Sequence, residues 1–252
     1  MTVEALLYSD MQNRCRSMCK PFFDFIHQED EPSQEFTPGT IEYQKRFVSP
    51  DSAEEYNTGC WKRRGWMARR EKRIVRELLS GHAGADAVLD LPCGGGRLSS
   101  VIGEFTGTII EMDIAAGQLL YGQRVSRCRA KQIWVKASAF DIPLEDNSVD
   151  GTVCMRLSHH LYTLKEKELL LAELLRVTRR FVVFYFVDSN SPKYLSRRIR
   201  KQFADLQYDH NSMTFSELSG LSEKFGGRIV KCASAAPFTP HRYALIEKRP
   251  AA

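Results

Sequence analysis

The chain has 252 residues, of which 43% are hydrophobic and 27% are charged, and its formal net charge is +5. These values are ordinary for a soluble globular protein that is long enough to bury a full core. The sequence contains no run of about 18 apolar residues, which excludes a predicted membrane span. Because its first residues lack the basic segment of a secretory signal, no such signal is predicted, and the cysteine pattern described below favours a cytoplasmic protein.

The charges are distributed unevenly along the chain. Residues 1–60 carry five Lys or Arg and eleven Asp or Glu, whereas the remaining residues carry 31 and 20. We therefore expect an acidic N-terminal leader, residues 1–50, before a basic body, residues 51–252. A basic body fits an anionic substrate or a nucleic acid, but it is also typical of a solvated surface.

The seven cysteines are scattered, their number is odd, and no Cys-x-x-Cys pair occurs. We interpret them as reduced, mostly structural thiols. Because the usual ligand spacing of a zinc site is absent, no metal is predicted.

Residues 51–80 are predicted to be helical. Asp51 or Ser52 is placed to cap the first helix, since acidic residues follow in the first turn. Seven Lys and Arg residues between positions 62 and 73 then form one face of a helix. Its other face is expected to carry apolar side chains, namely those of Met67, Ile74, Leu78 and Trp66. The basic face fits either solvent or a bound anion.

A glycine cluster follows an apolar run further along the chain. The run Ala87–Leu89 is followed by Asp90, and three glycines occupy positions 94–96. Apolar residues then recur at helical spacing, at Leu98, Val101, Ile102 and Phe105. This order predicts a buried parallel strand, a tight turn and a helix. Glycines let the backbone approach a ligand, and the start of the helix supplies free N–H groups.

Two phosphate-binding motifs do not fit this loop. The dinucleotide motif Gly-x-Gly-x-x-Gly requires glycines where Pro92 and Arg97 stand. The phosphate loop requires Gly-Lys-Ser or Gly-Lys-Thr, which does not follow. A carboxylate at Asp90 suits an ammonium group far better than a phosphate. A glycine-rich turn that binds nothing is the alternative.

A second predicted strand, residues 107–114, also ends in acids. Asp113 lies 19 residues after Gly94, close to the spacing at which a carboxylate meets ribose hydroxyls in nucleotide-binding units. Two vicinal hydroxyls need an acceptor with two oxygens, which a carboxylate provides. Glu111 alternates onto the same strand face, so either acid could serve.

The loop resembles motif I of the class I S-adenosylmethionine-dependent methyltransferases. The pattern reads Asp90-x-Pro92-x-Gly94-x-Gly96, with proline in place of the family's first glycine. The resemblance implies that S-adenosylmethionine is the cofactor. It further implies that Asp90 and the backbone of Gly94 and Gly96 hold the methionine end.

The same resemblance extends to the second strand and to the preceding helical segment. Met112-Asp113-Ile114-Ala115 is similar to the family's Val-Asp-Ile-Ser, which selects Asp113 as the residue that holds the ribose. In this family a helix such as that predicted within residues 51–80 often lies over the cofactor as a lid. Tyr56 and Trp61 are then candidates for contact with the cofactor, and aromatic packing is the alternative.

Residues 138–150 resemble the family's Asp-Ala-x-x-Leu-Pro-Phe-x-Asp-x-Ser-Phe-Asp. The resemblance implies that Ser138, Ala139 and Phe140 frame the adenine. Ser138 stands where the family has an aspartate, and a hydroxyl accepts a hydrogen bond more weakly than a carboxylate. Phe140 could pack on the adenine or fill the core.

A fourth predicted strand, residues 151–157, leads to His159 and His160. In open α/β sheets ligands bind at the carboxyl ends of strands, so this end faces the methyl donor. Either histidine could act as a general base, since neutral imidazole suits that task near pH 7. A buried packing histidine is the alternative for His160. Arg156 is a candidate to line the site or to orient an anionic substrate.

The remaining elements complete an α/β pattern. Residues 181–187 form a fully apolar strand, and Thr214 begins a capping-box helix. Residues 188–213 are interpreted as a basic insertion over the substrate. Two final strands, residues 228–233 and 241–248, predict an antiparallel hairpin. The fold class is therefore a doubly wound, Rossmann-like α/β domain with a mostly parallel seven-stranded sheet.

The resemblance covers residues 52–187 well and residues 214–248 weakly. It implies methyl transfer from S-adenosylmethionine to a small, unidentified acceptor. If the basic segments contact the acceptor, they favour one with a negative charge. One alternative is a catalytically silent protein that binds the cofactor. A third reading, RNA methylation, rests on the basic segments around Arg197, Arg198 and Arg200, but no recognised RNA-binding module supports it. The oligomeric state is not predicted.

Overall fold

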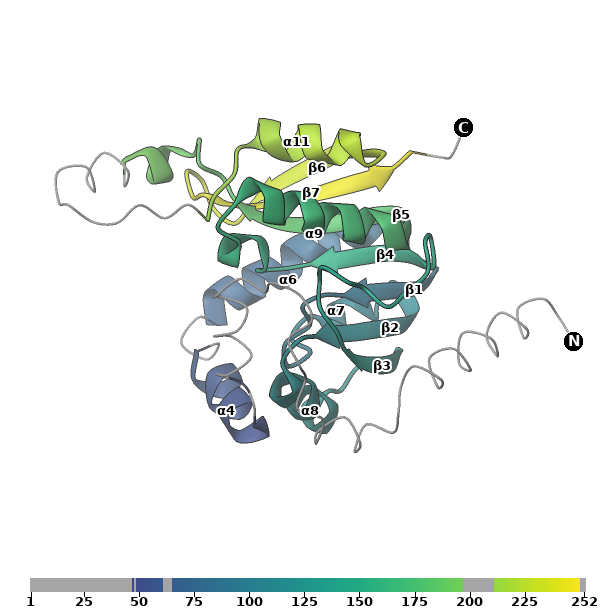
Figure 1. Ribbon diagram of the computed structural model, residues 1–252. Helices are drawn as coiled ribbons and strands as arrows, with labels where there is room; N and C mark the ends of the chain where they lie inside the picture. Colours follow the sequence, from purple (N-terminus) through teal and green to yellow (C-terminus); the bar gives the residue numbers. More distant parts are fainter. Residues whose placement is uncertain (1–46, 48, 61–64, 197–210, 250–252) are drawn as a thin grey trace, which may run out of the picture. The chain divides into compact units, whose positions relative to one another are not determined.

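The predicted strands assemble into one sheet in the computed structural model, which describes residues 47, 49–60, 65–196 and 211–249. The strands are β1 (Ala85–Asp90), β2 (Thr106–Asp113), β3 (Lys131–Lys136), β4 (Val149–Cys154), β5 (Thr178–Val187), β6 (Gly227–Ser234) and β7 (His241–Lys248). Their order in the sheet is β3-β2-β1-β4-β5-β7-β6 (Figure 1). β1 to β5 are parallel, and β7 pairs antiparallel with both β5 and β6. The predicted fold class, including the terminal antiparallel hairpin, is confirmed.

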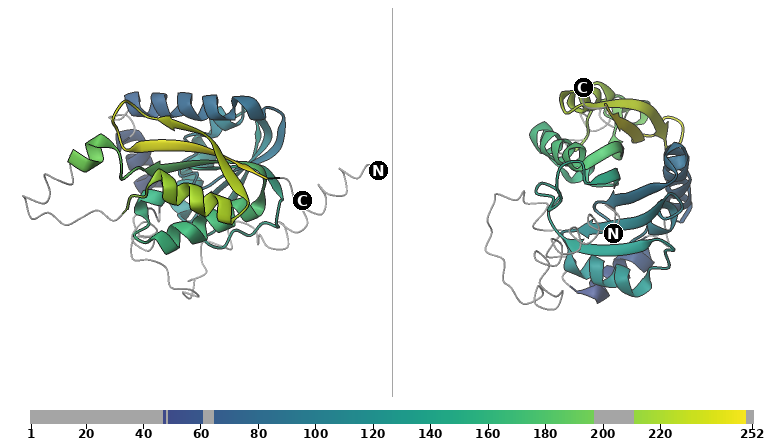
Figure 2. Two further views of the ribbon diagram at one scale, coloured as in Figure 1. Left: turned by 90° about the horizontal axis from the view of Figure 1, so that it is seen from above. Right: turned by 90° about the vertical axis from the view of Figure 1, so that its right-hand side faces the viewer.

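Helices cover both faces of the sheet. α6 (Gly65–Leu79) packs on one face, whereas α9 (Leu164–Val177) and α11 (Phe215–Lys224) pack on the other, as Figure 2 shows from above. The short α7 (Ser99–Ile102) lies on the α6 side, and α8 (Ala116–Val125) follows β2. This cover on both faces explains why adjacent residues in the middle of the central strands, such as Val88 with Leu89 and Ile109 with Ile110, are apolar.

Among the described residues the core has three apolar clusters, and the two larger ones lie one on each side of the sheet. Val88 and Ile109 pack on the α6 side, while their neighbours Leu89 and Ile110 pack on the α9 side. This alternation follows from the period of two residues in a β-strand. β5 lies between β4 and β7, and its residues 181–186 are at most 1% exposed. The prediction of a fully buried strand at this position is confirmed.

The chain before α6 forms a short helix and one irregular turn. α4 spans Pro50–Glu55 and is followed by a π-helical segment, Tyr56–Cys60. Its cap is Ser49, whose hydroxyl accepts from the N–H of Ser52 at 3.3 Å, so the prediction of Asp51 or Ser52 as cap is wrong. Pro50 explains the difference, because proline fits the first helical position. The helix therefore starts closer to the N-terminus than predicted.

Several predicted features lie outside the described residues. These are residues 1–46 of the acidic leader, Trp61, and the arginines at positions 197, 198 and 200. The segment 188–213 is described at both ends, where Asp188 and Met213 form a parallel bridge. Among the described residues, none of the helices is long and apolar enough to cross a membrane.

Candidate active site

The glycine loop follows β1 in a conformation that requires glycine. Gly94 has a φ of +55° and Gly96 a φ of +73°, both in the left-handed region. A Cβ atom on Gly95 would lie 2.7 Å from the Tyr121 ring and 2.9 Å from Asn57 Nδ2. The loop is therefore packed closely against α8 and against the segment that follows α4.

Three buried carboxyl groups lie beside this loop on one face of the sheet. Asp90 and Glu111 are register partners on β1 and β2, and Asp113 ends β2. They are at most 1% exposed. Burial raises the pKa of each group, to about 6 for Asp113 and well above the usual range for Asp90. For Asp90 the nearby Glu111 adds to the rise, and Arg97 opposes it.

Asp113 connects the end of β2 to the glycine loop. One carboxylate oxygen accepts from the N–H of Gly94 and the other from the N–H of Ala115, each at 2.9 Å. The N–H of Ile114 also contributes to this carboxylate, and since a carboxylate has about four acceptor positions, about one remains for a further donor. Glu111 instead accepts from Gln132 Nε2 at 2.7 Å, across to β3. The Oε2 atom of Glu111 has no hydrogen-bond partner among the described residues, so the choice of Asp113 over Glu111 rests on the motif resemblance.

Asp90 has the properties of a residue that receives a cationic group. Both of its carboxylate oxygens are buried, and neither has a hydrogen-bond partner among the described residues. A buried carboxylate without a donor is costly unless a donor or cation joins it. The methionine part of S-adenosylmethionine carries an ammonium group, so the donor set of the site fits this cofactor. Pro92 follows in the same turn and is partly exposed.

The predicted adenine residues form a tight turn after β3. The hydroxyl of Ser138 accepts from the N–H of Phe140 at 3.2 Å, and Ser138 also pairs with Asp141 as an isolated bridge. Ala139 and Phe140 are partly buried and pack against the core cluster on the α9 side. Phe140 therefore fills part of the core, as the packing alternative predicts. Ile114 is also partly exposed.

A buried acid of α6 pairs with two arginines at the ends of β1 and β4. Glu71 is 0% exposed; its Oε2 lies 2.6 Å from Arg97 Nη2, and its Oε1 accepts from Arg156 Nε at 3.0 Å. Tyr243 on β7 donates to the same Oε1 at 3.3 Å. Arg156 has a φ of +61° and lies over the Tyr185 ring. This cluster joins α6, the glycine loop and the strand ends.

The two predicted catalytic histidines lie beside this cluster. Their rings are 4.0 Å apart, and His159 also contacts the Tyr185 ring edge. Burial, together with His160 and Arg156, lowers the pKa of His159 to about 3. Burial and Arg156 also lower the pKa of His160, which is the more exposed of the two. The Tyr185 hydroxyl and His241 Nδ1 are 2.6 Å apart, which adds a second polar pair to this end of the sheet.

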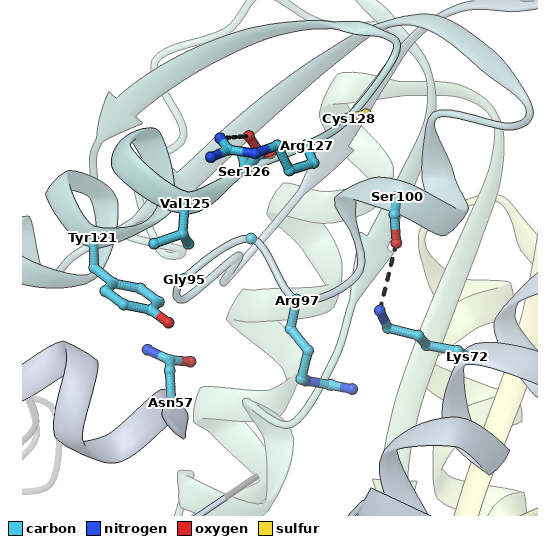
Figure 3. A pocket seen from close by; sticks show the side chains of 11 residues that line it. Asn57, Lys72, Gly95, Arg97, Ser100, Tyr121, Val125, Ser126, Arg127 and Cys128 are labelled. Carbon is cyan, nitrogen blue, oxygen red and sulfur yellow. Dashed lines mark hydrogen bonds between the residues drawn. The ribbon is translucent and has the colours of Figure 1, made fainter. Parts of the chain in front are cut away.

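A cavity of about 310 Å³ opens on the α8 side of the glycine loop. Figure 3 shows Gly95 between Tyr121 and Arg97, with Lys72 donating to Ser100 Oγ at 3.4 Å. Of the predicted cofactor residues, Gly96 lines this cavity, whereas Asp90 and Asp113 do not. We place the candidate cofactor site at the strand ends rather than here, because those two carboxylates lie at the strand ends.

The structure brings together Asp90, Gly94, Gly96 and Asp113, as the motifs predict. Tyr56, from the predicted lid, packs edge-on against Phe47 at 5.0 Å, which fits the aromatic-packing alternative. Sequence reasoning missed Glu71, Tyr185 and His241. For Glu71 a signal existed: it lies three, four and seven residues before Ile74, Val75 and Leu78, which form the apolar face of α6.

The strand order and the glycine loop define a Rossmann-like domain of the methyltransferase type. Residues 89–186 match the family model described as "Methyltransferase domain". The curated 2-phytyl-1,4-naphtoquinone methyltransferase of Trichormus variabilis is 28% identical over 148 residues. That alignment covers 55% of this chain and 63% of the relative.

Solved methyltransferase structures share the fold. Magnesium protoporphyrin IX methyltransferase from Synechocystis, with bound SAH, aligns with a TM-score of 0.63 at 15% identity, over 84% of this chain and all of the other. A SAM-dependent methyltransferase from Methanosarcina mazei aligns with a TM-score of 0.55 at 16% identity, over 68% of this chain and 96% of the other. The domain match covers residues 89–186, and these structures show that the chain has the fold of the class I S-adenosylmethionine-dependent methyltransferases.

Proposed function

We propose that this protein transfers a methyl group from S-adenosylmethionine to a small acceptor at the carboxyl ends of β1, β2 and β4. The observation that carries the proposal is the buried Asp90 carboxylate, whose two oxygens lack a hydrogen-bond donor among the described residues beside the glycine loop. The curated relative is named as a quinone methyltransferase, which supports a small acceptor. When bound, the cofactor supplies an electrophilic methyl group on a sulfonium.

The chain's own residues bind and orient the cofactor. Asp90 receives the ammonium group, and the backbone of Gly94 and Gly96 approaches the methionine end. Asp113 accepts from a ribose hydroxyl with the acceptor position that its backbone bonds leave open. The 138–140 turn frames the adenine. Holding donor and acceptor in line contributes several kcal/mol to catalysis by positioning alone.

The acceptor side is formed by the histidines after β4 and by the Tyr185–His241 pair. His160 is the better candidate for a general base, because the pKa of about 3 leaves His159 a weak base near neutral pH. The Arg156 guanidinium, shared with Glu71, borders the same space and favours an acceptor with negative charge. A deprotonated oxygen or an amine on such an acceptor is a suitable nucleophile.

Calorimetry and a transfer assay test this proposal together. We expect heat on titration with S-adenosylmethionine and with S-adenosylhomocysteine, and none with NAD. With a panel of quinols, phenols, carboxylic acids and amines, we expect S-adenosylhomocysteine to be released only when an acceptor is present. Asp90→Asn should abolish binding, whereas Asp86→Asn, at an exposed position near the start of β1, should leave it unchanged.

Two outcomes would contradict the proposal in different ways. Binding of NAD without any binding of S-adenosylmethionine would refute the cofactor assignment. Tight cofactor binding without turnover on any acceptor class would favour a regulatory protein that binds the cofactor and performs no chemistry.

A further inference from the structure

α6 carries an aromatic side chain and three arginines along its outer face. Trp66, Arg69, Arg70 and Arg73 are spaced at i, i+3, i+4 and i+7, so they follow one stripe of the helix. They line a surface depression of about 200 Å³, and none of the described residues that line it is acidic. We call these four residues the tryptophan–arginine stripe.

The position of Trp66 distinguishes this stripe from an ordinary solvated face. The sequence places Trp66 among the apolar residues of α6, but its side chain is 56% exposed and lies with the arginines, so that expectation is wrong. The Arg70 guanidinium carbon lies 5.9 Å from the centre of the Trp66 ring. The indole is therefore held at the surface beside cations, where its flat face can stack on another ring.

Arg70 supplies a second and independent observation. Its Nε atom is buried, yet it has no hydrogen-bond partner among the described residues. Arginine presents a planar set of donors that matches phosphate oxygens in pairs. A buried guanidinium nitrogen without an acceptor, in a depression lined by two more arginines, fits a bound oxyanion.

We propose that the tryptophan–arginine stripe binds a nucleotide unit, with the base stacked on Trp66 and the phosphate held by Arg69, Arg70 and Arg73. The same chemistry is offered by a free nucleotide and by a single-stranded nucleic acid, because both have an unpaired base next to a phosphate. A duplex keeps its bases stacked inside and does not offer this combination. The stripe adds a binding surface that methyl transfer itself does not require.

Helix α6 carries both the tryptophan–arginine stripe and Glu71, which belongs to the candidate active site. Glu71 follows Arg70 in the chain and points inward, where it pairs with Arg97 of the glycine loop. A ligand on the stripe would therefore contact the same turns of α6 that anchor the loop. This geometry places a bound nucleotide beside the cofactor site and separate from it.

Fluorescence anisotropy with the full-length protein tests the proposal. The probes are a labelled single-stranded decanucleotide, the matching duplex, and ATP as a competitor, each at several salt concentrations and without S-adenosylmethionine. We expect the single strand to bind more tightly than the duplex. Trp66→Ala should weaken binding about tenfold, since base stacking on an aromatic ring has an effect of that order. The logarithm of the association constant falls linearly with the logarithm of the salt concentration. Arg70→Gln and Arg73→Gln should each reduce the magnitude of this slope by about 0.7.

Matched controls lie on other elements. Phe215→Ala removes an aromatic ring that is 46% exposed on α11, and Arg228→Gln removes an exposed arginine of β6. Both should leave affinity unchanged. Displacement of the strand by micromolar ATP would identify a free nucleotide as the ligand, and no displacement would identify a nucleic acid. Absent binding, or binding that Trp66→Ala and Arg70→Gln do not alter, would overturn the proposal.

Discussion

The Oε2 atom of Glu71 lies 2.6 Å from Nη2 of Arg97, so a fully buried acid of α6 is paired with the residue that follows the last glycine of the loop. The other oxygen of the same carboxylate binds Arg156 after β4. One side chain thus joins the helix before β1 to both strand ends that border the candidate site.

We predict that Glu71→Gln lowers the free energy of unfolding by about 3 kcal/mol, because it leaves two largely buried guanidinium groups without their counter-charge. Urea denaturation would measure this change. Glu104→Gln is the matched control, because it breaks an exposed pair with Arg76 and should cost less than about 1 kcal/mol. Equal losses in the two variants would show that the Glu71 cluster is no more important than a surface pair.

Cofactor affinity should depend on pH through Asp113. Burial raises the pKa of this carboxyl group to about 6, and the ionised form is the better acceptor for ribose hydroxyls. Affinity should therefore rise between pH 5 and pH 7 and then level off, and at pH 5 it should be roughly tenfold below the plateau.

Calorimetry across this pH range checks the Asp113 prediction. Asp90 and Glu111 share the strand face and Arg97 lies close by, so the carboxyl groups titrate as a coupled set. The Asp113→Asn variant should bind the cofactor weakly, and its affinity should no longer change near pH 6. An unchanged step in that variant would assign the pH dependence to another group.

We predict that Gly95→Ala destabilises the loop and weakens cofactor binding. The added Cβ would lie 2.7 Å from the Tyr121 ring, and such overpacking typically costs about 1–3 kcal/mol. Gly220→Ala is a suitable comparison, since no atom lies within 4 Å of its Cβ position in α11. That variant should gain about 0.5–1 kcal/mol from helix propensity. Thermal unfolding would record shifts of opposite sign, and a stabilised Gly95→Ala would refute the close packing.

The two histidines should differ in their effect on turnover. Because the pKa of His159 is about 3, its imidazole is a poor proton acceptor at neutral pH, and His159→Gln should change kcat mainly through packing. His160→Gln should lower kcat by about 100-fold at pH 7 if His160 is the base. Values of kcat measured for both variants from pH 5 to 9 show which histidine acts as the base. A larger loss in His159→Gln, with its pH profile altered, would reverse the assignment.

Much of the fold followed from local patterns. The apolar runs that became β1, β2 and β5 were recognised because buried parallel strands are continuously apolar, and Thr214 was recognised as a cap. The ends of elements were predicted less well: the helix expected to be capped by Asp51 or Ser52 is capped by Ser49, two or three residues earlier. The prediction that Trp66 lies on the apolar side of α6 was also wrong, since an aromatic ring at the edge of an apolar face can turn either way.

By itself the sequence determined the glycine loop, its two flanking acids and the succession of strands and helices along the chain, because these depend on residues that are close in the chain. Only the tertiary structure decided the contacts of Glu71 with Tyr243, 172 residues away, and of Tyr185 with His241, 56 residues away. Such contacts join side chains from elements whose relative rotation is set by the packing of the whole core. No local pattern encodes that rotation.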